Sequence, residues 1–151
     1  MTELSLCHPR SGRVMTVTGP IGSADLGHTL MHEHLQNDCR CWWNAPTDPA
    51  RQHLADCPVS IEILSELRQD PFVNRHNIAL DDPDLAIAEL RAFTAVGGRS
   101  VVDPTCRGIG RDPVTLRRIA GETGLNIVMG AGYYLASSMP EQVARLSIDD
   151  I

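Results

Sequence analysis

The sequence predicts an α/β fold built on parallel strands, and three observations lead to this prediction. Apolar runs near residues 31, 101 and 127 have the length of buried strands. One stretch with helical spacing of apolar residues precedes the run near residue 101, and a second lies between the runs near residues 101 and 127. Glycines stand where each of these helices ends. Strand, loop, capped helix, glycine and strand follow each other as they do in βαβ units.

A short β-hairpin and the first parallel strand are predicted before residue 36. Residues 13–18 alternate in polarity and meet Gly19-Pro20, which is a turn signal. Residues 28–35 are expected to form the strand, because the apolar run Thr29-Leu30-Met31 lies within them.

A long, irregular stretch comes next, over residues 36–81. It is rich in Pro, Asp and Asn, and a partial apolar face predicts one helix in it, over residues 60–68. A connection of this length between regular elements is usually functional. We therefore interpret residues 36–81 as a long loop insertion after the first parallel strand.

Two helices with clear boundaries follow the long loop. Asp82-Pro83 and Asp112-Pro113 each combine a capping Asp with a Pro at the first helical position. Gly97-Gly98 and Gly124 mark where these helices stop. The sequence therefore predicts both ends of both helices.

Each of these helices leads into an apolar strand, over residues 100–103 and 125–129, and a third helix is predicted from Pro140 to Ile151. Three parallel strands do not close a sheet, because the outer two keep unpaired edges. The simplest interpretation is that residues 1–151 are a single, incomplete domain, the N-terminal part of a larger (β/α) fold. A complete eight-stranded barrel needs about 250 residues.

Composition and charge exclude several classes of function. The 151 residues carry a net charge of −6, so no surface for nucleic acid or anionic lipid is expected. No stretch approaches the roughly 18 apolar residues of a membrane span. Residues 1–12 lack the apolar core of a signal peptide, and we expect a cytoplasmic protein. All 13 basic residues are arginine, so any lysine that the chemistry needs must come from elsewhere.

The five cysteines fit reduced thiols better than a disulfide framework, because their number is odd and their spacing irregular. Cys39 and Cys41 could supply half of a metal site, but a lone C-x-C is a weak signal, and loop thiols are the favoured interpretation. A redox or zinc-ribbon module is disfavoured, because no C-x-x-C occurs.

The strongest functional signal is His32-Glu33-His34, at the end of the first parallel strand. Side chains at positions i and i+2 of a strand point to the same face, so the two imidazoles should share one space. In a parallel barrel, functional groups lie at the carboxyl ends of the strands. Two neutral imidazoles there are half of a site for zinc or a similar ion. The alternative is that they are ordinary core or loop histidines.

Two motifs near the next strand end are open to more than one interpretation. Asp103 could be a metal ligand, a partner that orients a ligand, or a turn residue, and the last two are favoured. The stretch Gly108–Asp112 could bind an anion at a helix N-terminus. It lacks the spacing of a dinucleotide or phosphate-binding loop, so a tight loop that feeds a capped helix is favoured.

The remaining candidates are aromatic. Small residues in Gly130–Tyr134 leave room beside a site, where a tyrosine could bond a substrate oxygen or a metal-bound water. Alternatively, Tyr133 and Tyr134 cover the rim of the fold. Trp42 and Trp43 either wall an apolar pocket or fasten the long loop.

Taken in order, these residues resemble the phosphotriesterase family of the amidohydrolase superfamily. The resemblance covers most of the chain outside residues 36–81. H-x-H alone is not specific, but the ordered series is. It comprises G-P-I at Gly19–Ile21, T-L-M-H-E-H at Thr29–His34, V-V-D-P-T at Val101–Thr105, G-I-G-R-D at Gly108–Asp112 and G-x-G-x-Y at Gly130–Tyr134.

The resemblance implies a distorted (β/α)8 TIM barrel, preceded by a short β-hairpin, of which this chain supplies about three strands of eight. It implies that His32 and His34 ligate the more buried of two metal ions, expected to be zinc, with manganese or cobalt as alternatives. Tyr134 matches a tyrosine that lies near the metal-bound hydroxide in lactonase members. A bridging carboxylated lysine or glutamate, two histidines and an aspartate are expected beyond Ile151.

Two classes of function follow. The leading hypothesis is a metal-dependent hydrolase, in which a metal-activated hydroxide attacks a small lactone, carboxylic ester or phosphotriester. Nucleic acid and membranes are not expected as partners, and a homodimer is compatible with the sequence. The alternative is a truncated, non-catalytic fragment that at most binds a metal weakly through His32 and His34, because two ligands do not complete a four-coordinate zinc site.

Overall fold

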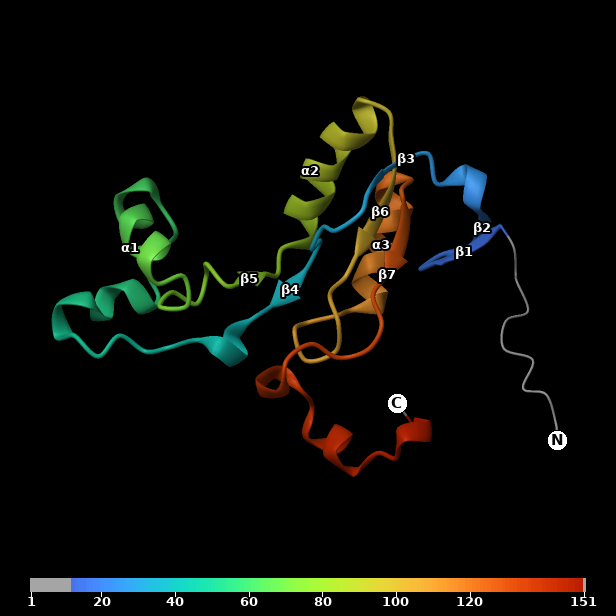
Figure 1. Ribbon diagram of the computed structural model, residues 1–151. Coiled ribbons are helices and arrows are strands. Elements are labelled where there is room, and N and C mark those ends of the chain that lie inside the picture. Colours follow the sequence, from blue (N-terminus) through green and yellow to red (C-terminus); the bar gives the residue numbers. More distant parts are fainter. Residues whose placement is uncertain (1–11, 151) are drawn as a thin grey trace.

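A computed structural model describes residues 12–150, in which two helices pack against a three-stranded parallel sheet (Figure 1). The sheet has the order β3-β6-β7, and each pair of neighbouring strands is parallel. Its strands are β3 (His28–Leu30), β6 (Gly98–Asp103) and β7 (Asn126–Met129), and its helices are α2 (Pro83–Ala95) and α3 (Pro113–Thr123). The predicted parallel α/β fold is therefore confirmed.

The two helices begin and end where the sequence predicts. The side chains of Asp82 and Asp112 each accept hydrogen bonds from two backbone N–H groups in the first turn of their helix. Gly124 adopts a left-handed conformation with φ of 72°, which ends α3 without the steric cost of a side chain. In residues 12–150, no helix is long and apolar enough to cross a membrane.

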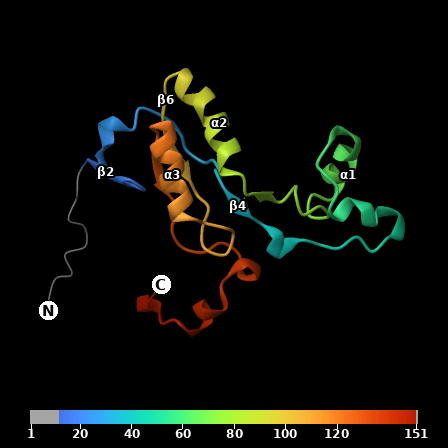
Figure 2. The same cartoon turned by 180° about the vertical axis from the view of Figure 1, so that it is seen from behind.

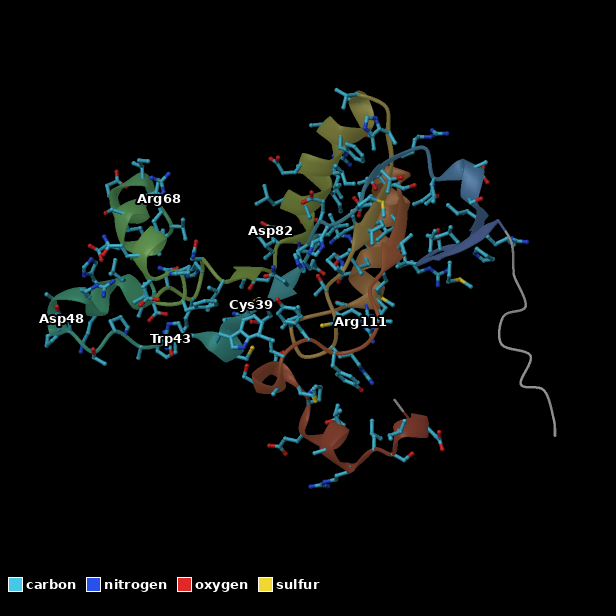
Figure 3. All side chains as sticks on the ribbon, in the orientation of Figure 1. Cys39, Trp43, Asp48, Arg68, Asp82 and Arg111 are labelled. Carbon is cyan, nitrogen blue, oxygen red and sulfur yellow. The ribbon has the colours of Figure 1, made fainter. Side chains whose placement is uncertain are left out.

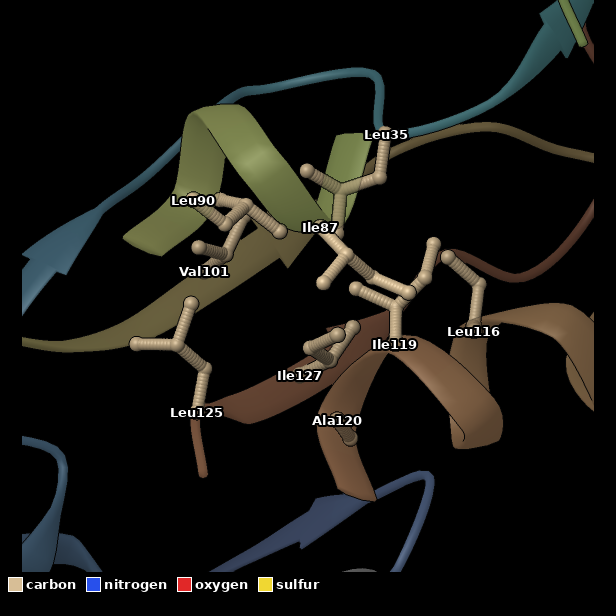
Figure 4. Packing of buried hydrophobic residues seen from close by; sticks show 9 residues of the cluster. All are labelled: Leu35, Ile87, Leu90, Val101, Leu116, Ile119, Ala120, Leu125 and Ile127. Carbon is tan, nitrogen blue, oxygen red and sulfur yellow. The ribbon is translucent and has the colours of Figure 1, made fainter. Parts of the chain in front are cut away.

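The core lies between one face of the sheet and the two helices. Val101 and Ile127 are partners in the register of β6 and β7, so their side chains point to the same face. Both are fully buried, and burial of such a side chain contributes about 1.5–3 kcal/mol. Residues of both helices complete the cluster in Figure 4, which comprises Leu35, Ile87, Leu90, Val101, Leu116, Ile119, Ala120, Leu125 and Ile127.

A β-hairpin precedes the sheet, as predicted. Its strands are β1 (Arg13–Thr16) and β2 (Gly19–Gly22), which pair antiparallel. The first strand is shorter than the predicted residues 13–18, because the Thr16 hydroxyl donates to the carbonyl of Gly19 and closes the turn. The N–H of Val17 donates to the carbonyl of Ile127 at 2.9 Å, which fastens the hairpin to β7.

Residues 36–81 leave the sheet and return to it through a pair of short strands. These are β4 (Asn37–Asp38) and β5 (Ala79–Leu80), which pair antiparallel at the base of the loop. Figures 1 and 2 show that α1 (Leu64–Gln69) lies far out on this loop, away from the sheet. The helix predicted over residues 60–68 is split, with a 3-10 turn at Ile61–Ile63 before α1.

The outer part of the loop has a hydrophobic cluster of its own. Leu54, Leu67 and Val73 are buried against one another, apart from the main core. Leu54 belongs to a 3-10 helix at Pro49–Ala55, and Leu67 belongs to α1. The loop is therefore held by its own packing as well as by the strands at its base.

The first parallel strand is shorter than predicted. A strand over residues 28–35 was expected, but β3 ends at Leu30. The N–H of Glu33 still donates to the carbonyl of Val102, at 3.1 Å, so contact with β6 continues after the strand. The N–H of Leu35, however, donates to the Asp103 carboxylate, so a side chain replaces the partner that a strand would have supplied.

The prediction of a third helix from Pro140 onwards is wrong. The chain forms 3-10 turns at Glu141–Arg145 and Ile148–Asp150, separated by an extended Leu146, and Ile151 lies outside the described residues. A short helix is marginal unless it packs an apolar face against a partner. Of this segment's apolar side chains, Val143 is buried whereas Ile148 is 92% exposed.

Candidate functional site

The two histidines of the H-x-H motif lie directly after β3, where the chain leaves the carboxyl end of the sheet. Their ring centroids are 5.5 Å apart, and the ring planes are inclined at 74°. His34 is half-buried, whereas His32 is exposed. The two imidazoles therefore occupy one region, as their spacing predicts, although the strand has already ended.

The end of β6 holds His34 in place. Nδ1 of His34 lies 2.7 Å from the hydroxyl oxygen of Thr105. The same hydroxyl donates a hydrogen bond of 2.9 Å to the backbone carbonyl of Gln36. Thr105 is 1% exposed, whereas His34 and Gln36 are half-buried, so this bridge joins the edge of the core to the loop after β3.

Asp103 ties the same two segments together through the backbone. It is fully buried, and one carboxylate oxygen accepts from the N–H of Leu35 at 3.1 Å. The other oxygen accepts from the N–H of Thr105 at 2.8 Å, which forms a tight turn after β6. Asp103 thus forms a turn, which is one of the two interpretations that the sequence favours, whereas the imidazole of His34 is contacted by Thr105 and not by Asp103.

Sequence reasoning gave no role to the Thr105 side chain. The sequence held a signal for the turn, because an Asp at a strand end commonly accepts from the backbone N–H two residues on, but it held none for the Thr105 hydroxyl. The sequence does not predict the contact between Thr105 and His34, because the two residues are 71 positions apart in the chain.

The histidine pair stands without a third ligand in the part of the chain that is described. Among residues 12–150, no group of three or more His, Cys, Asp or Glu side chains is placed to hold a metal ion. Glu33 and His34 both border an apolar groove of about 490 Å³ between β3 and α2. Leu30, Leu35 and Leu90 also line this groove. Glu33 and His34 thus border the same groove, although alternation along a strand would place them on opposite faces, because β3 has already ended at Leu30.

The two neighbouring tryptophans have different roles. The indole N–H of Trp43 donates to the carbonyl of Val73 at 3.0 Å, and the Arg75 guanidinium lies 3.5 Å from the centre of its ring. This arrangement fastens the long loop, on which Trp43 is labelled in Figure 3. Trp42 instead donates from its indole N–H to the Ser137 hydroxyl at 2.7 Å, and so joins the long loop to the loop that follows β7.

An aromatic group surrounds Trp42. Its ring makes edge contacts with Phe72 and Tyr134, with centroid distances of 6.2 and 5.9 Å. Tyr134 is 62% exposed, so its ring lies at the rim of the fold with an accessible face. The tyrosine proposed from the sequence is thus next to a tryptophan of the long loop.

The glycine-rich stretch Gly108–Asp112 forms a close-packed turn. Gly110 has φ of 90°, and a Cβ there would lie 2.6 Å from the backbone nitrogen of Asp38 in β4. A Cβ on Gly108 would collide with the carbonyl oxygen of Ser138. Both glycines are needed for close approach of backbone, which supports the tight-loop interpretation.

The C-x-C cysteines lie at the base of the long loop. Burial raises the pKa of the Cys39 thiol, and the neighbouring Cys41 and Asp38 raise it further. Burial likewise raises the pKa of the Cys41 thiol. Both thiols are thereby kept protonated, which fits ordinary loop thiols rather than reactive ones. Cys7 lies outside the described residues.

Comparison with known sequences assigns the family. The sequence profile of the Phosphotriesterase family matches residues 12–150. The chain belongs to this family. The resemblance drawn from the ordered motifs is therefore confirmed.

Named relatives and solved structures of this family match the same residues. An N-acetyltaurine hydrolase of Xenopus tropicalis is 38% identical over 143 residues, which are 93% of this chain and 40% of that protein. A crystal structure of a resiniferatoxin-binding protein from Rhodobacter sphaeroides is 78% identical, with a TM-score of 0.89, and this chain covers 42% of it. This chain thus spans about two-fifths of the length of these relatives.

The architecture is shared more widely than the sequence. The lactonase Lmo2620 from Listeria monocytogenes is 22% identical, with a TM-score of 0.58 over 89% of this chain and 33% of that protein. Phosphotriesterase-family folds are (β/α)8 barrels, and the sheet of β3, β6 and β7 with its two helices corresponds to the N-terminal part of one.

Proposed function

We propose that the full-length protein is a metal-dependent hydrolase in which His32 and His34 bind one of two divalent ions. The observation that carries this proposal is the placement of two imidazoles together at the carboxyl end of a parallel strand, in a chain of the phosphotriesterase family. We propose zinc as the metal, with manganese or cobalt as alternatives.

The donor set fits such an ion. Imidazole nitrogen is a preferred zinc ligand, and ligating histidines commonly engage their second ring nitrogen in a hydrogen bond. His34 has this arrangement, because its Nδ1 is occupied by Thr105 and its Nε2 has no partner in the described residues. When bound, the metal pair would supply Lewis-acid polarisation and activation of water for attack on the substrate.

The residues of this chain would bind and orient the substrate. Trp42, Phe72 and Tyr134 form an aromatic wall that comes from two different loops. The exposed Tyr134 hydroxyl is the group we assign to a substrate oxygen. The long loop would thereby set substrate choice, as loops at the carboxyl ends of barrel strands do.

The proposed substrate is a small lactone, carboxylic ester or phosphotriester. The relatives named N-acetyltaurine hydrolases extend this range to carboxylic amides, because attack of water on an acyl carbon is common to esters and amides. A cytoplasmic location and a homodimer are proposals that rest on the sequence alone.

The alternative function is that of a non-catalytic polypeptide that binds a metal weakly through His32 and His34. It is favoured by one observation, that the described residues offer these two ligands and no third. The two proposals differ in metal content, because two imidazoles alone hold zinc far less tightly than a complete site.

The test is to replace each histidine by alanine in the full-length protein. We expect His32→Ala and His34→Ala to lose tightly bound metal, measured by atomic emission, together with hydrolysis of lactones, esters and N-acyl amides. His53→Ala is the matched control, because this exposed loop histidine bonds only the carbonyl of Ala50. Full metal content and rate in either site variant would overturn the assignment.

A further inference from the structure

We propose that Thr105 is a positioning residue that fixes the tautomer of His34 and so presents Nε2 of His34 to the metal. This inference rests on the proposed metal site, which it deepens. Its basis is the bridge in which one buried hydroxyl contacts both Nδ1 of His34 and the backbone carbonyl of Gln36.

The argument is a count of protons. A threonine hydroxyl carries one hydrogen, and a backbone carbonyl can only accept. The 2.9 Å bond from Thr105 to the carbonyl of Gln36 therefore uses the hydroxyl hydrogen. At the 2.7 Å contact with His34, the hydroxyl oxygen is left as the acceptor, so Nδ1 of His34 must carry the proton and donate. In a neutral imidazole, Nε2 is then the nitrogen with a free lone pair.

The surroundings make this arrangement rigid. The Asp103 carboxylate accepts from the N–H of Thr105 and from the N–H of Leu35, the residue next to His34. The backbone on both sides of the bridge is thus fastened to one buried side chain. His34 can neither flip its ring nor exchange tautomers without leaving the Gln36 carbonyl or its own Nδ1 without a partner, which is costly beside the buried Thr105 side chain.

The test uses the full-length protein, with bound metal removed by a chelator and zinc as the probe. We expect Thr105→Val to lower the affinity for zinc by about 10- to 100-fold, the range typical of lost hydrogen bonds behind a ligand. Thr105→Ser retains the hydroxyl and should bind zinc nearly as wild type does. Thr16→Val is the control, because Thr16 is also buried and bonds a backbone carbonyl, but in the hairpin.

A second readout follows the tautomer directly. In the metal-free protein labelled with 15N-histidine, under alkaline conditions in which free imidazoles are neutral, we expect the spectrum of His34 to report a protonated Nδ1. In Thr105→Val the spectrum should shift towards the Nε2-protonated form, whereas Thr105→Ser and Thr16→Val should not change it.

The outcomes separate this inference from the proposed function. A wild-type protein that binds no zinc would defeat the proposed function, whereas the tautomer of His34 would still be decided by the spectrum. A folded Thr105→Val with wild-type zinc affinity would overturn the inference alone. If Thr105→Val does not fold, an Nε2-protonated His34 in the wild type overturns the inference, and an Nδ1-protonated His34 that persists in Thr105→Ser supports it.

Discussion

Asp82, Asp103 and Asp112 each use their side-chain carboxylate to accept hydrogen bonds from backbone N–H groups. Asp82 and Asp112 do so at the first turns of α2 and α3, and Asp103 does so between the end of β6 and the chain around His34. Each provides an acceptor that the main chain cannot supply at that point. Single side chains thus determine where the helices begin and where the candidate ligand lies.

The capping carboxylate of Asp112 makes a pH-dependent contribution to stability. Hydrogen bonds from the Thr115 hydroxyl and from backbone N–H groups lower the pKa of Asp112. Folding therefore favours the charged form. The contribution is fully present above the ordinary Asp pKa of about 4 and is lost as the pH falls through the lower pKa of the folded state.

We expect Asp112→Ala to reduce the free energy of unfolding by about 1 kcal/mol at neutral pH, measured by urea denaturation. Asp112→Asn keeps a capping oxygen without the charge and should cost less. The gap between wild type and Asp112→Asn should close below about pH 4. A gap that is the same at pH 7 and in acid would contradict the assigned role of the charge.

At the scale of elements, patterns that are local in sequence could be predicted and distant partners could not. The helix of Asp82 to Gly97 carries its cap, its apolar stripe and its stop within one stretch, and the structure has it as α2. The length of β3 could not be predicted, because Asp103 takes up the N–H of Leu35 from 68 residues away. The turns after Pro140 could not be predicted either, because spacing alone does not show whether a helix finds a packing partner.

The features of the candidate site also divide into those that the sequence predicts and those that it does not. The pair of His32 and His34 could be proposed from its spacing alone, and the ordered motifs added the family. The bridge through Thr105 could not be proposed from the sequence, because His34 and Thr105 are 71 residues apart and meet only in the folded chain. The contact of Trp42 with Ser137 is equally distant, at 95 residues.

The turn between β6 and α3 gives a prediction about close approach of backbone. We expect Gly110→Ala to lower the free energy of unfolding by more than Gly124→Ala, measured by thermal or urea denaturation. Both glycines have positive φ, which costs an alanine about 1–2 kcal/mol. Only at Gly110 would the new Cβ meet backbone, 2.6 Å from the nitrogen of Asp38, whereas Gly124 has nothing within 4 Å. Equal losses of unfolding free energy in the two variants would show that the backbone of β4 can move aside at no cost, which would contradict this prediction.

At the scale of the whole molecule, the sheet of the described residues is open. β3 and β7 are its outer strands, and the hairpin contacts β7 through the bond from Val17 to the Ile127 carbonyl. Beside β3 lies the apolar groove, and Leu80 and Leu85 on its border are more than half exposed. Such surfaces promote association when nothing covers them.

We therefore expect residues 1–151, expressed alone, to associate or precipitate at micromolar concentration. Light scattering coupled to size exclusion measures this, with the full-length protein in the same buffer as the control. A monodisperse monomer that unfolds cooperatively would show that the open sheet is stable without further strands.

The pairing of β4 with β5 has a consequence for how this protein can change over evolutionary time. The two strands keep the ends of residues 36–81 side by side, while Leu54, Leu67 and Val73 give the outer part its own packing. Added length inside such a loop is cheap, because doubling a flexible loop costs only about 0.6 kcal/mol in closure entropy. Mutations can accumulate there while the sheet continues to meet the same two attachment points. Sequence change and sequence constancy are thus expected in different stretches of one chain.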